Sequence, residues 1–426
     1  MIDIALIRQN ADEVARQYAR RGFEVSFDEL LSLDTARRAL IAENDANKQR
    51  RNEVSGKIPQ MKKAGEDTTA LIAEMKALGD TIAQNDAAIA QNEEQLSAFM
   101  SRLPNLPGEG IPDGGKENNR VVRTWGQKPA FDFEPLNHVD LCAKLGLIDY
   151  ERGVKMSGSG FWVYRGEGAR LEWAMLNYFI DQHLRDGYEL VLVPHLLNYE
   201  SGYTAGQFPK FVDDVFWIAE EDGQRKRFIL PTAETALVNM HRNEILSEDD
   251  LPRKYISYTP CYRREAGSYR AEERGMVRGH QFNKIEMFQY VKPEDSHAAH
   301  DELVRKAETL LQGLELHYQL CQLAAGDVSD AMAYTWDPEI WIPSMGIYKE
   351  ASSVSNAMDY QARRGNIRFK NTQTGKNEFV HTLNGSGLAT SRLLPAIVEQ
   401  HQQKDGSVRI PEALIPYFGK DRIVPV

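Results

Sequence analysis

Three separated stretches of this 426-residue chain combine arginine with glutamate, serine or glycine in patterns that suit phosphate chemistry. The first begins with Tyr262-Arg263-Arg264-Glu265 and continues through a polar, arginine-bearing stretch to Phe282. A strand would place Arg263 and Glu265 on one face, because side chains alternate along a strand. Arg263 could then grip a phosphate with its forked guanidinium, and Phe282 could stack on a base. The alternative is a cross-strand ion pair on a solvated face. The polar stretch carries Arg270, Arg274 and Arg278.

The second stretch is Glu350-Ala351-Ser352-Ser353. Glu350 and Ser353 offer hard oxygen ligands close together. This arrangement suits Mg²⁺, because that ion takes few protein ligands and draws the rest from water and phosphate. The alternative is a strand end followed by a serine-rich turn.

The third stretch runs from His381 through Asn384-Gly385-Ser386-Gly387 to Arg392. We expect a strand that meets a Gly-Ser-Gly turn, and then a helix with Arg392 in its first turns. Glycine lets a backbone approach a ligand closely, and a helix N-terminus favours anions. Neither a GxGxxG fingerprint opening a helix nor a GxxxxGK[ST] loop occurs, so bound ATP would not use either phosphate loop.

The elements that must position these residues lie after about residue 135. Helical patterns cover 167–187, 295–315 and 389–402. Between them are short runs typical of strands: Leu190–Pro194, Phe228–Leu230, Tyr255–Tyr258, Lys284–Val291, Ile340–Ile342 and Glu378–Thr382. Regular alternation of strand and helix is missing. The pattern therefore predicts an α+β fold with a mainly antiparallel sheet and flanking helices.

The first hundred residues follow a different pattern. We expect one amphipathic helix over 1–26, ending at Gly22, and two long helices over 27–103 that fold back on each other at a tight turn near 64–67. The second arm has a heptad seam, and the first arm repeats it more weakly. The seam residues are Leu71, Met75, Leu78, Ile82, Asn85, Ile89, Asn92, Leu96 and Phe99, and then Leu40, Asn44, Asn47, Arg51, Val54, Ile58 and Met61.

The two arms differ in charge. Residues 37–63 carry a net charge of +5, and residues 66–96 a net charge of −6. The charges could simply pair across the seam, or the basic arm could contact phosphates. The whole chain has 51 basic and 62 acidic side chains and a formal net charge of −11. That balance excludes a protein that binds nucleic acid over its whole surface, and leaves only local basic faces for such binding.

The cysteines and the hydropathy disfavour several classes of protein. Cys142, Cys261 and Cys321 lie far apart with no histidine at ligand spacing, which disfavours a disulfide scaffold and a zinc ribbon. We therefore expect a reduced, cytoplasmic protein. No apolar run approaches the length of a transmembrane helix.

Taken together, these residues resemble the class II aminoacyl-tRNA synthetases, and within them the seryl-tRNA synthetase family. The three class II motifs are matched by 167–194, by 262–282 and by 385–392. The helical hairpin and three further runs are typical of the seryl branch. Those runs are Thr204-Ala205-Gly206-Gln207-Phe208-Pro209-Lys210-Phe211, Pro231-Thr232-Ala233-Glu234 and His381-Thr382-Leu383-Asn384-Gly385-Ser386-Gly387.

The resemblance implies a domain plan and an activity. Residues 1–103 would form a tRNA-binding domain with the hairpin over about 27–103, residues 104–134 a linker, and residues 135–426 the catalytic domain. The protein would be a homodimer. It would activate L-serine with ATP and Mg²⁺, and it would charge serine tRNA and also selenocysteine tRNA at the 3′ end. The long variable arm of the tRNA would lie on the hairpin at Arg37, Arg38, Lys48, Arg50, Arg51 and Lys57.

The resemblance also implies roles for individual residues. Arg263, Glu265 and Arg392 would be catalytic. Arg263 would hold the α-phosphate and the serine carboxylate, and Arg392 the γ-phosphate of a bent ATP. Glu265 and Phe282 would hold the adenine. The other implied ATP contacts are Arg264, Gly279, Glu350, Ala351, Ser352 and Ser353, with Glu350 and Ser353 as Mg²⁺ ligands. The implied serine site comprises Thr232, Ala233, Glu234, Arg263, Glu286, Asn384 and Ser386.

Two other functions fit parts of the same pattern. One is a synthetase paralogue that charges an acceptor other than tRNA, or that uses a different small amino acid; the hairpin argues against another acceptor. The other is a catalytically inactive RNA-binding homologue, which the retained arginine and metal-type residues disfavour. The run Thr335-Trp336-Asp337-Pro338-Glu339 departs from the pattern usual in the family. Because Pro338 lacks a backbone donor, we expect it at a sheet edge or a strand start.

Overall fold

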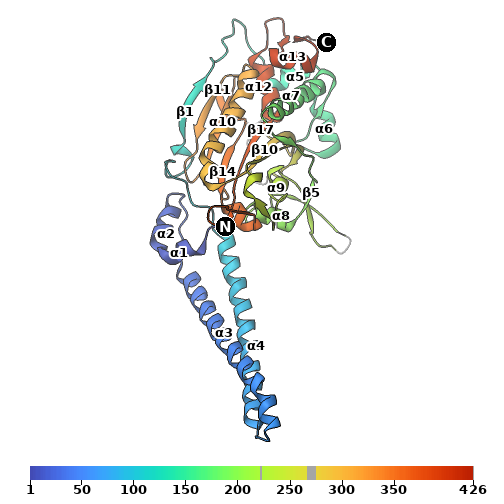
Figure 1. Ribbon diagram of the computed structural model, residues 1–426. Helices are drawn as coiled ribbons and strands as arrows, with labels where there is room; N and C mark the ends of the chain where they lie inside the picture. Colours follow the sequence, from blue (N-terminus) through green and yellow to red (C-terminus); the bar gives the residue numbers. More distant parts are fainter. Residues whose placement is uncertain (221–222, 266–274, 426) are drawn as a thin grey trace. The chain divides into compact units, whose positions relative to one another are not determined.

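The computed structural model describes residues 1–220, 223–265 and 275–425 (Figure 1). The chain divides into two compact units. The smaller unit comprises residues 2–19 and 23–103, and the larger unit the rest of the chain.

Two long helices dominate the smaller unit, as the heptad pattern predicts. α3 spans Asp28–Lys63 and α4 spans Thr69–Arg102, and Figure 1 shows them side by side. Contacts between early residues of one and late residues of the other make the pair antiparallel, so the predicted hairpin is confirmed. The side chains of the predicted seam are all buried or partly buried.

A buried polar side chain specifies the register of this hairpin. Asn44 is 1% exposed, and its Nδ2 donates to the Ile82 carbonyl at 3.4 Å and to Asp86 Oδ1 at 2.8 Å. Sliding one helix past the other would leave that amide unpaired in the seam. A polar residue at such a position specifies register at some cost in stability.

The predicted single helix over 1–26 is wrong, because two short helices lie there. α1 spans Ile4–Gln9 and α2 spans Ala11–Ala19. Asn10 leaves the helical geometry, with φ −157° and ψ 83°, and its Oδ1 accepts a hydrogen bond from the Glu13 amide at 3.1 Å. Asparagine is well suited to end one helix and cap the next, because its side chain competes for backbone donors.

The larger unit is built on a nine-stranded sheet in the order β1-β11-β12-β14-β17-β10-β9-β4, with β13 also paired to β12. Among the described strands of this sheet, only β4 runs parallel to its neighbour, so the predicted antiparallel α+β class is confirmed. The strands are β1 Arg120–Trp125, β4 Glu189–Leu190, β9 Arg253–Tyr262, β10 Gln281–Val291, β11 Tyr318–Gln322, β12 Tyr334–Ile342, β13 Ile347–Glu350, β14 Val354–Met358 and β17 His381–Ala389.

The three predicted helices of this unit are confirmed as α7 Gly166–Arg185, α10 Ser296–Gly313 and α12 Thr390–Gln400. All three pack on the sheet and bury aliphatic side chains in one large core. Smaller elements complete the unit: α5 His138–Lys144, α6 Tyr150–Ser157, α8 Tyr199–Thr204, α9 Glu234–Leu237, α11 Tyr360–Gly365, α13 Ile415–Phe418, and the short sheets β5 Leu196–Asn198 with β6 Phe216–Ile218 and β7 Arg227–Ile229, and β8 Ile245–Ser247 with β15 Arg368–Lys370 and β16 Asn377–Phe379.

The predicted Gly-Ser-Gly turn is wrong, because β17 runs through Gly385, Ser386 and Gly387 without a break. The glycines serve close packing instead. A Cβ on Gly387 would lie 2.4 Å from Nε2 of His183 on α7, and that nitrogen contacts the Gly387 carbonyl at 3.0 Å. A side chain at this position would push the helix off the strand.

Pro338 also lies where we did not expect it, inside β12 rather than at its start or at a sheet edge. Its carbonyl accepts from the Ala351 amide at 2.8 Å. The nitrogen of a strand residue points to the same side as its carbonyl, so the missing N–H of Pro338 faces away from β11. On that other side of β12, the pairing with β14 reaches only to Trp336, and the pairing with β13 starts at Glu339. The proline therefore occupies a gap between partners and costs no ladder bond.

No helix among the described residues is long and apolar enough to span a bilayer.

A buried carboxylate ties the first short helix of the smaller unit, α1, to α3. The Asp34 side chain is 1% exposed. Its two oxygens accept from Arg8 at 2.7 Å and 2.6 Å, and Arg38 adds a third hydrogen bond at 3.1 Å. The hydrogen bond from Arg8 is the main reason why the pKa of Asp34 lies below its usual value.

We expect Asp34→Ala to destabilise the smaller unit by about 2–4 kcal/mol, because charge-assisted hydrogen bonds are lost and the arginines are left without their partner. Hydrogen–deuterium exchange should show faster opening of α1 and of the first turns of α3. Asp45→Ala, at an exposed position of the same helix, should change stability by less than about 0.5 kcal/mol. Equal protection in both variants would contradict the assigned role of Asp34.

Candidate functional site

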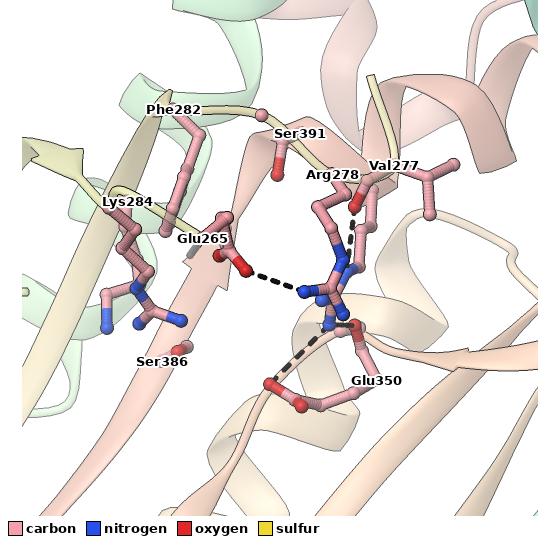
Figure 2. A pocket seen from close by; sticks show the side chains of 13 residues that line it. Glu265, Val277, Arg278, Phe282, Lys284, Glu350, Ser386 and Ser391 are labelled. Atoms are coloured by element: carbon pink, nitrogen blue, oxygen red, sulfur yellow. Dashed lines mark hydrogen bonds and ion pairs between the residues drawn. The ribbon is translucent and has the colours of Figure 1, made fainter. Parts of the chain in front are cut away.

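A polar pocket opens where β10, β17 and the start of α12 meet (Figure 2). Arg263 and Arg392, which lie far apart in the sequence, both line it. The other predicted site residues on its wall are Glu265, Gly279, Phe282, Glu350, Ala351 and Ser386. Arg270 and Arg274 of the connecting stretch lie outside the described residues.

Arg263 follows β9 rather than belonging to it, so the prediction that one strand presents Arg263 and Glu265 is wrong. β9 ends at Tyr262, and Glu265 has φ 47°, which is incompatible with a strand. The Arg263 backbone still pairs with His280 at 2.9 Å, which closes the base of the connection. Its guanidinium carbon lies 5.2 Å from the centre of the Phe282 ring, and its Nε donates to a backbone carbonyl at 3.3 Å.

Glu265 forms its ion pair with Arg278, at 2.6 Å, and not with Arg263 (Figure 2). The cross-strand pair between Arg263 and Glu265, which the sequence left open, is therefore absent from the contacts of the described residues. The Arg263 guanidinium is left facing a pocket rather than a carboxylate.

Arg392 is the third residue of α12 and is held by backbone oxygens. Its Nη1 donates to the Glu350 carbonyl at 2.7 Å, and its Nε donates to the Val277 carbonyl at 3.3 Å. The Glu350 carboxylate lies 3.6 Å away (Figure 2). The hydrogen bonds that orient the guanidinium come from carbonyl oxygens, and the Glu350 carboxylate is beyond hydrogen-bond distance, so Arg392 can still bind an anion.

Next to this pocket lies a cluster of buried polar side chains. Glu286 is fully buried and forms an ion pair with Lys284, which also donates to Thr232 Oγ1 at 2.8 Å. The Asn384 amide bridges two carboxylates, reaching Glu286 at 3.1 Å and Glu234 at 3.3 Å. Asn384 Oδ1 is buried and has no hydrogen-bond partner among the described residues, so a donor from a ligand could satisfy it.

Burial and the nearby charge of Glu286 raise the pKa of Glu234 to about 7. A hydrogen bond from Gln361, at 2.8 Å, opposes this shift, as do the charges of Lys284 and Arg263. Two acidic groups in a partly compensated, buried site favour a small ligand that carries an ammonium group and a hydroxyl donor.

The remaining predicted site residues occupy different positions. Ser352 is buried and donates to the Ser386 carbonyl at 2.8 Å, so its hydroxyl is already used. The Arg264 guanidinium donates to the Asp213 carbonyl at 2.8 Å and does not line the pocket. Gly279 packs beneath Trp162, where a Cβ would lie 2.2 Å from the ring. Ala233, next to Glu234, is fully buried, and Ser353 lies in the turn between β13 and β14.

The sequence reasoning missed several wall residues, of which Lys284 is the most informative. It lies two residues before Glu286 in β10, so both side chains face the same side of the sheet. A lysine at that spacing before a glutamate was the available signal for a compensating cation. The other wall residues not predicted are Val277, Ala389 and Ser391, whereas Arg278 was noted only as part of the arginine-bearing stretch.

On α3, the basic residues assigned to tRNA divide into three kinds. Three of them form ion pairs with α4: Arg37 with Glu93 at 3.2 Å, Lys48 with Asp86 at 3.4 Å, and Arg50 with Glu74 at 3.2 Å. Arg38 binds Asp34 instead. Arg51 and Lys57 form no ion pair within the described part of the chain. Pairing across the seam therefore accounts for only part of the basic arm.

Two protein-family models match parts of the chain. Residues 1–107 match the seryl-tRNA synthetase N-terminal domain, and residues 216–401 match the tRNA synthetase class II core domain (G, H, P, S and T). Serine–tRNA ligase 2 of Clostridium acetobutylicum is 56% identical over 425 residues, which cover 99% of this chain and 100% of the relative.

Solved structures agree as well. Seryl-tRNA synthetase from Pyrococcus horikoshii, crystallised with ATP, superposes with a TM-score of 0.93 at 35% identity over 100% of both chains. Cytoplasmic serine–tRNA ligase from Naegleria fowleri, in complex with AMP, has a TM-score of 0.89 at 27% identity over 100% of this chain and 99% of its own. With its helical hairpin, its antiparallel catalytic sheet and full-length similarity of this extent, the chain belongs to the seryl-tRNA synthetase family.

Proposed function

We propose that this chain is a serine–tRNA ligase, which activates L-serine with ATP as seryl-adenylate and transfers the seryl group to the 3′ end of serine tRNA. The observation that carries the proposal is the pocket that Arg263 and Arg392 both line, next to half-buried Glu234 and fully buried Glu286. One end of this arrangement suits a polyphosphate and the other a small amino acid. Charging of selenocysteine tRNA stays a prediction from the resemblance.

In the first step, a serine carboxylate oxygen attacks the α-phosphorus of ATP and pyrophosphate leaves. A carboxylate is already ionised at neutral pH, so the step needs no general base. Its rate depends on bringing two anions together and on neutralising charge as the transition state forms. Arg263 would hold the serine carboxylate against the α-phosphate, and Arg392 would bind the γ-phosphate of a bent ATP.

Phe282 would stack on the adenine, with Glu265 beside it. The position of the Arg263 guanidinium over the Phe282 ring supports this arrangement, because phosphate and base must lie on adjacent parts of one wall. The Arg278–Glu265 ion pair would then border the nucleotide. Gly279 would contribute by letting this wall close onto Trp162. Ala351, on the same wall, would contact the nucleotide.

The buried acids would recognise serine. Glu234 and Glu286 would bind the ammonium group and the hydroxyl, with Thr232 and Ser386 completing the pocket. The unsatisfied Oδ1 of Asn384 supports a ligand that brings a donor. A site built to hydrogen-bond the hydroxyl would reject alanine, because its polar groups would be left unpaired.

Mg²⁺ fits the oxygen donors at Glu350 and Ser353. No group of three or more histidine, cysteine, aspartate and glutamate side chains in the described part of the chain is arranged to bind a metal. An ion with only two protein ligands must take the rest from phosphate and water, which is the behaviour of Mg²⁺. Asp337 lies close by, and its buried Oδ1 has no partner among the described residues. When bound, Mg²⁺ would neutralise phosphate charge.

We assign the basic arm of α3 to binding the long variable arm of serine tRNA. Lys57, which is exposed and outside any ion pair within the described residues, supports this assignment.

We assign a face near α7 to the interface of a homodimer. Trp173 is 53% exposed and Leu192 is 79% exposed, and large apolar side chains at such exposure support this assignment.

Arg263→Ala and Arg392→Ala should each reduce serine-dependent ATP–pyrophosphate exchange by about 10³-fold or more, because charge-stabilising arginines in phosphoryl transfer are worth that much. Both side chains lie on a pocket wall, so circular dichroism and thermal melting should stay close to wild type. Arg305→Ala, at an exposed position of α10, is the control and should keep full activity. Near-normal exchange in either pocket variant would rule out the assigned roles.

Serine binding should depend on pH through Glu234. With a pKa of about 7, this carboxyl is mostly neutral at pH 6 and mostly ionised at pH 8. Only the ionised form attracts the serine ammonium group, so the KM for serine should fall about tenfold from pH 6 to pH 8. In Glu234→Gln the KM should be higher and nearly constant over this range. A wild-type KM that is flat, or that rises with pH, would contradict the assignment.

Lys57→Glu should raise the KM for serine tRNA about tenfold and leave pyrophosphate exchange unchanged, because it replaces a phosphate contact by a repulsive charge. Lys76→Glu makes the same change on α4, the acidic arm, and should have little effect. Both positions are exposed, so stability should change little in either variant. Equal effects of the two variants would remove α3 as the tRNA-binding face.

A further inference from the structure

A buried carboxylate lies behind the sheet that carries the ATP pocket. Glu172 of α7 is 3% exposed. Its Oε1 accepts hydrogen bonds from Asn283 Nδ2 at 2.7 Å and from Thr390 Oγ1 at 2.5 Å. Burial raises the pKa of Glu172 to about 7, and the hydrogen bonds from Thr390 and Asn283 oppose that shift. Burying this group is costly, so its hydrogen bonds must compensate for the lost hydration.

Its first partner, Asn283, lies between two residues of the pocket wall. Phe282 and Lys284 of β10 line the pocket, so Asn283 faces the opposite side of the sheet, where α7 packs. Both ends of its amide are engaged, because Oδ1 accepts from the Tyr258 hydroxyl at 3.1 Å. The hydrogen bond to Glu172 therefore restrains the part of β10 that presents Phe282.

Its second partner, Thr390, is the first residue of α12. The next two residues, Ser391 and Arg392, line the pocket. The Thr390 hydroxyl also lies 3.2 Å from the Asn283 carbonyl. One carboxylate oxygen thus joins the strand that carries Phe282 to the helix that carries Arg392.

We infer that Glu172 is a positioning residue for ATP, which sets the separation between the Phe282 ring and the Arg392 guanidinium from behind the sheet. The inference rests on the proposed function, in which these two side chains hold opposite ends of the nucleotide. Glu172 does not line the pocket and would touch no substrate. Its effect would come through geometry, and in phosphoryl transfer small displacements of binding groups reduce the rate strongly.

Glu172 should affect the binding of ATP and not the binding of serine. Glu172 restrains the nucleotide side of the site, whereas Glu234, Glu286 and Asn384 are held by their own hydrogen bonds. Loss of Glu172 should therefore weaken ATP binding and leave serine binding almost unchanged. A purely structural role would lower stability without selecting one substrate.

Glu172→Ala and Glu172→Gln test this in pyrophosphate exchange with ATP and serine varied separately. Glu172→Ala should raise the KM for ATP about tenfold or more and change the KM for serine less than about twofold. Glu172→Gln keeps a carbonyl acceptor for Asn283 and Thr390, so its KM for ATP should stay within about threefold of wild type. Phe179→Leu, at another fully buried position of α7, is the control for lost packing and should leave both KM values unchanged.

Thr390→Val covers the case in which Glu172→Ala does not fold, because it removes only the hydroxyl; it should raise the KM for ATP selectively. An unchanged KM for ATP in Thr390→Val and Glu172→Ala, or an equal rise in Phe179→Leu, would overturn the inference. A wild-type chain without serine-dependent exchange would instead refute the proposed function. Calorimetric titration of the same variants with ATP would then still decide whether Glu172 positions the nucleotide site.

Discussion

Arg263 and Arg392 must be held in one pocket and still remain available to phosphate, and the rest of the catalytic unit follows from that constraint. Arg263 and Arg392 are oriented by backbone carbonyls, at Pro231 for the first and at Glu350 and Val277 for the second. These hydrogen bonds come from neutral carbonyls, and the Glu350 carboxylate lies 3.6 Å from Arg392, beyond hydrogen-bond distance, so it competes less with phosphate than a directly bonded carboxylate would. Because these carbonyls belong to distant segments, only a folded sheet can supply them, which ties anion binding to the integrity of the core.

The amino-acid side of the site solves the opposite problem, which is to bury acidic groups at tolerable cost. Lys284 compensates Glu286, while the Asn384 and Gln361 amides satisfy Glu234. Compensation is incomplete, and the raised pKa of Glu234 is the result. The ammonium group of a ligand would complete the compensation. The uncompensated acidic charge that raises the pKa of Glu234 is therefore also what would attract the ligand.

Prediction from the sequence succeeded where a local repeat determines the structure. It failed where contacts with residues distant in sequence determine it. The seam from Leu71 to Phe99 is a local repeat, and α3 and α4 followed from it. Gly387 reads as a turn residue until His183 is known to pack on it. Pro338 is tolerated only because its two partner strands leave a gap beside it. Arg263 lies just after the end of β9, and its amide pairs with the carbonyl of His280, which is distant in sequence. The role of Glu172 could not be read locally at all, since its partners lie in two other elements.

The ion pairs between α3 and α4 have a consequence for selectivity. Glu74, Asp86 and Glu93 act as intramolecular competitors for the cations of the basic arm. A stray acidic peptide gains little by exchanging one carboxylate for another, whereas a densely charged polyanion with regular spacing can displace several at once. If the hairpin binds tRNA as proposed, these ion pairs would favour ligands of high linear charge density over singly charged ones.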